Sequence, residues 1–107
     1  MRNYDRRRVY PRGFKTFKIL EYIQINPRTS KEIRLYSFEL SYGKGTFDKK
    51  EDRGYWCMAF HNSPYKEYKG CLAEKLEYNF DSKRYNVSEK GLQYLDQYKG
   101  MFDHIRI

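Results

Sequence analysis

Basic side chains are concentrated at the amino end of this 107-residue chain. Residues 1–18 hold seven of its 22 lysines and arginines and a single acidic residue, so most of the net charge of +8 lies there. Such cations bind phosphates with release of counterions, and arginine is favoured in the negative potential of a narrow minor groove. We therefore expect residues 1–13 to form a basic arm that contacts nucleic acid, the alternative being a solvated tail. The candidate ligands in this arm are Arg6, Arg7, Arg8 and Arg12.

Two cysteines and two histidines are the residue types that could bind zinc, but their spacing does not suit a zinc finger. Cys57 and His61 are the only close pair, and His104 lies near the end of the chain. We expect Cys57 and Cys71 to be buried, reduced thiols. The sequence therefore predicts neither a metal nor a cofactor.

Patterns typical of catalysis are weak in this chain. The triplet Glu67-x-Lys69 resembles part of a metal-nuclease site, but acid-x-lysine triplets arise easily in a sequence with 34% charged residues. Gly43-Lys44-Gly45 is too short for a phosphate-binding loop and lacks the helix that should follow it. No Ser–His or Cys–His set is recognisable, so we predict that the protein is not an enzyme.

The composition is typical of one folded domain. With 39% hydrophobic residues, the chain can form a single core, which we place in residues 14–107. No run of about 18 apolar residues is present, so we expect no membrane span. The first residues lack the apolar segment of a secretory signal, and we expect a cytoplasmic protein.

Two helices are predicted in the first half of this domain. Residues 14–25 have a helical spacing of apolar residues, and Asn26-Pro27 should end that helix. Thr29 and Glu32 form the pattern of a capping box at the start of a second helix, and a glycine-rich, charged loop is expected at 41–52. The expected core positions are Phe14, Phe17, Ile19, Leu20 and Ile23 in the first helix, and Ile33, Tyr36 and Leu40 in the second.

The segment that follows leaves three interpretations open. We favour a helix over 53–62, capped by Asp52, with Trp56 on its buried side. The alternation of apolar residues in the same segment also allows a strand. A third possibility is a short helix at 63–70, because Ser63-Pro64 supplies a cap and a first-turn proline.

The last part of the chain predicts a hairpin and a helix. Alternating residues from Leu72 to Phe80 indicate a strand, residues 81–83 form the turn, and residues 84–87 form the returning strand. Ser88 should cap a final helix. The core positions expected from this helix are Leu92, Leu95, Tyr98 or Lys99, and Phe102.

The block GCLAEKLEYNFDSKRYNVSEKGLQYL at 70–95, together with TSKEI at 29–33, resembles the winged helix-turn-helix DNA-binding superfamily. The segment KGTFDKKEDRGYWCMAF is also similar to small winged-helix proteins of bacterial viruses. The resemblance covers roughly residues 14–98 and implies an α+β fold with three helices, a two-stranded wing and a C-terminal helix. The sequence departs from the winged-helix pattern at residues 41–71, a stretch that is long for the usual tight helix-turn-helix.

This resemblance implies that the chain binds duplex DNA, as a small transcriptional regulator. Residues 53–62 would enter the major groove, where the side chains of His61 and Asn62 can reach base edges, and the wing tip would contact phosphates. The nucleic-acid ligands beyond the arm are then Lys49, Lys50, Arg53, His61, Asn62, Lys66, Lys83 and Arg84.

Other partners remain open at this point. The body outside the arm is almost neutral and rich in tyrosine, which also suits a protein-binding winged-helix module, such as a viral or regulatory modulator of a host enzyme. Exposed tyrosines would also suit unpaired strands or RNA. The apolar tail, Met101-Phe102 and 105–107, could form a homodimer or fold back onto its own core.

Overall fold

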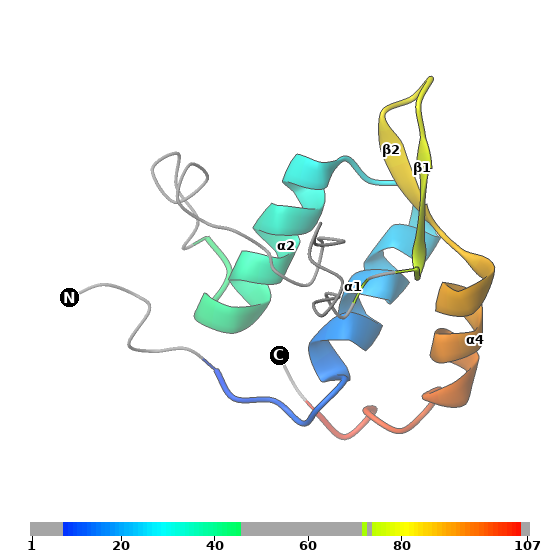
Figure 1. Ribbon diagram of the computed structural model, residues 1–107. Helices are drawn as coiled ribbons and strands as arrows, with labels where there is room; N and C mark the ends of the chain where they lie inside the picture. Colours follow the sequence, from blue (N-terminus) through cyan, green and yellow to red (C-terminus); the bar gives the residue numbers. More distant parts are fainter. Residues whose placement is uncertain (1–7, 46–71, 73, 106–107) are drawn as a thin grey trace, which may run out of the picture.

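A computed structural model of the chain describes residues 8–45, 72 and 74–105 (Figure 1). This part is mixed α+β: helices α1 (Phe14–Ile25) and α2 (Ser30–Tyr42) precede an antiparallel hairpin of β1 (Leu76–Asn79) and β2 (Arg84–Val87), and helix α4 (Glu89–Gln97) follows. No helix in this described part is long and apolar enough to cross a membrane.

Helix α1 is the centre of the fold and packs against α2, α4 and β2 (Figure 1). Its bounds are those predicted from the sequence, and Asn26 at its end has an extended conformation, as the following proline requires. All five apolar positions predicted for this helix are buried. The hydrophobic periodicity of residues 14–25 was therefore sufficient to identify the central element.

Helix α2 begins with the predicted capping box. The Thr29 hydroxyl accepts a hydrogen bond from the Glu32 amide, and the Glu32 carboxylate accepts one from the Thr29 amide. The loop expected from residue 41 is wrong at its start, because the helix continues to Tyr42 and ends at Gly43 with φ 112°. Its buried surface is also wider than the predicted stripe and includes Phe38.

The hairpin has the predicted second strand but a shorter first strand. Pairing begins at Leu76 with Val87 and ends at Asn79 with Arg84. Leu72 is buried outside the strand, and Glu74 has φ 65°, which breaks the extended conformation that the alternation from residue 72 had suggested. The expected strand 72–80 is therefore corrected to Leu76–Asn79.

Ser88 joins the base of the hairpin to α4. Its hydroxyl accepts the Gly91 amide at 3.1 Å, which confirms the predicted cap, and it donates to the Glu74 carbonyl at 2.7 Å. Gly91 itself is buried, and a Cβ there would lie 2.4 Å from the Lys75 carbonyl oxygen. The helix and the chain entering β1 therefore touch at backbone distance.

The tail after α4 folds back onto α1. Phe102 is buried between Phe14 and Phe17, with ring centroids 5.6 and 5.5 Å away, and Ile105 packs against the same core. Leu95 is buried as predicted. Leu92, which was also predicted to be buried, has 46% of its surface exposed.

Candidate functional site

The hairpin is attached to the connection between α1 and α2. Arg28 and Tyr85 exchange both of their backbone hydrogen bonds, at 3.2 and 2.7 Å, in an isolated antiparallel bridge. This pairing places β2 beside the connection that leads into α2 (Figure 1). Nothing in the local sequence pattern had indicated it, because Arg28 lies in a connection of four residues between the two helices.

Glu32 connects the two parts through its carboxylate. Oε1 accepts a hydrogen bond from Arg84 at 3.1 Å in addition to the capping bond from Thr29, and Oε2 lies 3.7 Å from the Arg28 guanidinium. The backbone hydrogen bond from Thr29, followed by the side-chain bond from Thr29 and the charges of Arg84 and Arg28, lowers the pKa of Glu32 despite the opposing effect of burial. Glu32 is therefore an anion that caps α2 and binds two arginines.

The two arginines differ in how firmly they are held. Arg28 lies over the ring of Tyr22 at 3.9 Å and donates to the Tyr22 carbonyl at 3.3 Å, and Tyr22 stacks on Tyr36 at 4.2 Å. Arg84 also donates to the Pro27 carbonyl at 3.1 Å, but 44% of its side chain is exposed. Arg84 is therefore accessible to a ligand, whereas Arg28 chiefly holds the corner together.

The tip of the hairpin is a compact four-residue loop. The Asn79 side chain accepts the amides of Asp81 and Ser82 at 2.9 and 3.1 Å, and the Asn79 carbonyl accepts the Lys83 amide at 2.8 Å. Lys83 has φ 58°, a left-handed conformation that closes the turn. Its side chain is exposed and has no partner within the described part of the chain.

We call this region the basic corner, defined as Arg28, Lys31, Lys83 and Arg84. It joins the first turn of α2 to the hairpin. Lys31 follows the cap of α2 and is exposed. Among the described residues, the carboxylates of the corner are Glu32, which is already paired, and Asp81 on the turn. The corner is thus a positively charged surface built on hydrogen-bonded backbone.

A second group of cations lies at the other end of α2. The Arg8 amide donates to the Ser41 carbonyl at 2.7 Å, and the Tyr10 hydroxyl donates to the Leu40 carbonyl at 2.8 Å. We call the exposed cations of this region, Arg8, Arg12 and Lys44, the arm end. Since α2 has 13 residues, the arm end and the basic corner are about 20 Å apart along the helix.

The predicted ligands divide into three sets. The structure places Lys83 and Arg84 together at the basic corner, and Arg8 and Arg12 at the arm end. Tyr10, which follows the arginine triplet, packs against Phe14 with ring centroids 4.6 Å apart. The remaining predicted ligands lie outside the described residues: Arg6, Arg7, Lys49, Lys50, Arg53, His61, Asn62 and Lys66.

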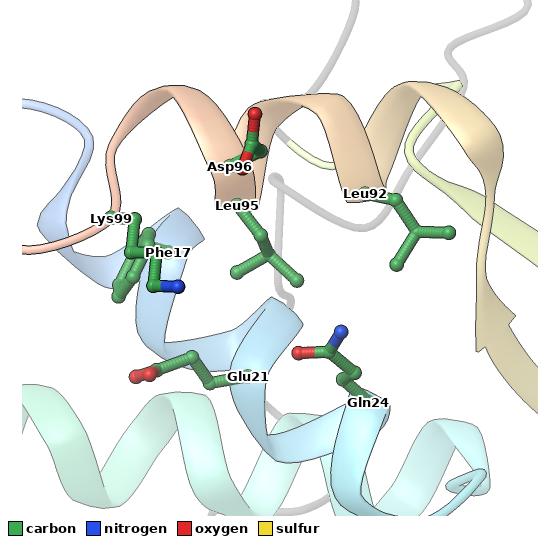
Figure 2. Close-up of a pocket in the computed structure, with 7 residues that line it drawn as sticks. All are labelled: Phe17, Glu21, Gln24, Leu92, Leu95, Asp96 and Lys99. Carbon is green, nitrogen blue, oxygen red and sulfur yellow. The ribbon is translucent and has the colours of Figure 1, made fainter.

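A shallow groove runs between α1 and α4 on another face, with a volume of about 370 Å³. Leu92 and Leu95 project from α4 toward α1, while Glu21 and Gln24 line the opposite side (Figure 2). The groove has an apolar floor and charged rims.

Within the described residues, no group of three or more His, Cys, Asp or Glu side chains is arranged to hold a metal ion. The predictions concerning Cys57, His61 and Cys71 fall outside these residues. No protein-family model matches the chain, and neither a curated protein nor a solved structure matches it.

Proposed function

We propose that the chain is a winged helix-turn-helix protein that binds duplex DNA and acts as a small transcriptional regulator. The basic corner is the observation that carries this proposal. It brings a helix N-terminus and a hairpin together, and it exposes Lys31, Lys83 and part of Arg84 on one surface. Exposed cations on rigid backbone are suited to phosphates, which give affinity and register without reading sequence.

The order of the described elements supports the winged-helix assignment. Two helices, an antiparallel hairpin and a further helix follow one another in an order compatible with the resemblance. The third helix, predicted at 53–62 with 63–70 as the alternative, lies outside the described residues. The hairpin is held along the edge of β2 by the Arg28–Tyr85 bridge and at its base by Ser88. A wing held in this way can present its tip to a duplex without losing much conformational entropy on binding.

The spacing of the two basic regions supports a duplex as the ligand. The arm end and the basic corner are separated by about 20 Å along α2, and a duplex carries one phosphate charge per roughly 1.7 Å of its axis. A double helix lying along α2 therefore offers phosphates to both regions. A small phosphorylated ligand would reach only one of them.

The test is the salt dependence of binding. The affinity of the full chain for a fluorescent duplex, measured by anisotropy between about 50 and 200 mM salt, should fall with a log–log slope of roughly −0.9 for each phosphate contact. Lys83→Gln should remove one phosphate contact and so reduce the magnitude of this slope by about 0.9. Binding that is insensitive to salt, or absent at low salt, would refute the proposal.

A protein partner is the second candidate, and the groove between α1 and α4 is the observation that favours it. Leu92 lies half exposed beside Phe17 and Leu95, so its apolar surface is available to a protein partner. Under this alternative, Leu92→Asp would abolish binding of the partner. Salt and the Lys83→Gln change would have little effect.

A further inference from the structure

Phe80 is the most exposed aromatic side chain among the described residues, with 83% of its surface accessible. It occupies the first position of the hairpin loop, which Lys83 closes by donating its amide to the Asn79 carbonyl. An apolar ring at this position contributes little to the core of the protein. Because most of the ring is exposed at the tip of the hairpin, it is available for an external contact.

Contacts within the hairpin hold the Phe80 ring in place. Tyr78 packs edge-on against Phe80 with ring centroids 4.9 Å apart, and Tyr78 in turn packs against Tyr85 on the paired strand at 4.8 Å. The backbone below the ring is fixed by the two amides that Asn79 accepts. Phe80 is therefore a preorganised apolar projection, and ordering it on binding costs little.

A nucleic-acid duplex offers a site that suits such a projection. Proteins that bend DNA insert apolar wedges, including phenylalanine, between base steps from the minor groove. The steps that open most easily are TA and CA/TG. Lys83 lies on the same loop as Phe80, so its ammonium group can bind a backbone phosphate while the ring reaches the bases.

We propose that Phe80 is a wedge that partly unstacks a base step and bends the duplex, with TA steps favoured. This inference rests on the proposed function and adds a mode of recognition to it. Phosphate contacts at the basic corner set the register of the protein. The wedge then gives a preference for deformable steps, without a hydrogen bond to any base.

The experiment uses the full chain and a duplex that carries 2-aminopurine at a central TA step, whose fluorescence rises when the base unstacks. Wild-type protein should raise this fluorescence. Phe80→Ala should abolish the rise and weaken binding at least fivefold, with the salt slope unchanged, since aromatic–base stacking is worth about 1 to 3 kcal/mol per base. Phe80→Leu should keep part of the rise.

Leu92→Ala is the matched control, because Leu92 is an exposed apolar residue on α4, away from the hairpin tip. It should leave both readouts unchanged. If Phe80→Ala binds the duplex with wild-type affinity and gives the same fluorescence rise, Phe80 is not a wedge, although the protein still binds DNA. If Phe80→Ala weakens binding to single-stranded DNA but not to the duplex, Phe80 is not a wedge either. If wild-type protein binds no duplex at low salt, the wedge and the proposed function fail together.

Discussion

Replacing Glu32 by glutamine separates the two roles of this residue. Glutamine keeps an oxygen that can accept the Thr29 amide, so the cap of α2 remains, but it removes the negative charge that faces Arg28 and Arg84. The side chains of the Glu32–Arg84 pair are 35% and 44% exposed. An ion pair at this exposure contributes about 0.2 to 1 kcal/mol, so loss of the Arg84 pair should lower the free energy of unfolding by about that amount.

DNA binding should change in the opposite direction. In the wild-type protein, a phosphate that approaches Arg84 competes with the Glu32 carboxylate 3.1 Å away and is also repelled by it. Removing this charge should favour the complex by about 0.5 to 1 kcal/mol, which is a twofold to fivefold gain in affinity. The log–log salt slope should become steeper by up to about 0.9, because Arg84 can then neutralise a phosphate fully.

The assay is fluorescence anisotropy with one duplex at several salt concentrations, together with urea denaturation of each variant. Glu21→Gln is the matched control, since it makes the same change in net charge on α1, beside the groove rather than the corner. It should leave the slope unchanged. If Glu32→Gln binds DNA no better than Glu21→Gln, Arg84 does not contact a phosphate and the reasoning is refuted.

Three further predictions concern the elements that position the site. Gly91→Ala should lower the free energy of unfolding in urea by about 1 to 2 kcal/mol, because overpacking against the Lys75 carbonyl outweighs the gain in helix propensity; an unchanged midpoint would contradict the close contact. Thr29→Ala should cost about 1 kcal/mol in the same measurement through loss of the cap, and a neutral result would mean that the cap is dispensable. Burial raises the pKa of Tyr36 to about 12, so unfolded chains lose this proton first and stability should fall as the pH rises from 10 toward 12. Tyr36→Phe should reduce that loss in thermal melts across the same interval; an equal loss would show that other groups cause it.

Features that depend on a few adjacent residues could be predicted from the sequence. The apolar spacing of residues 14–25, the capping box at Thr29 and the cap at Ser88 all act within one or two turns, and the structure confirms them. The first strand was drawn too long because alternation alone cannot show that Glu74 has a positive φ. Leu92 was assigned to the core because a helical pattern shows which residues share a face, but not how far the neighbouring helix extends.

The candidate site was harder to predict, because its geometry depends on contacts distant in sequence. Lys83 and Arg84 were recognised from the turn, but the pairing of Arg84 with Glu32 joins residues 52 positions apart. Arg28 was missed because it precedes the Thr29 cap and so lies outside the helix to which the i,i+4 ion-pair pattern applies. Lys31 was missed because one lysine on a helix surface carries no local signature.

The separation of the two basic regions leads to a final prediction about additivity. The length of α2, about 20 Å, exceeds the Debye length of roughly 8 to 10 Å near physiological salt. Arg12 and Lys83 therefore should not influence each other. The double variant with Arg12→Gln and Lys83→Gln should lower the log of the DNA affinity by the sum of the two single effects. Lys83→Gln with Arg84→Gln should deviate from the sum, because both residues lie at the basic corner. The opposite result would be strong non-additivity for Arg12 and Lys83 together with additivity for Lys83 and Arg84. In that case the two basic regions do not contact one duplex at the separation that α2 sets.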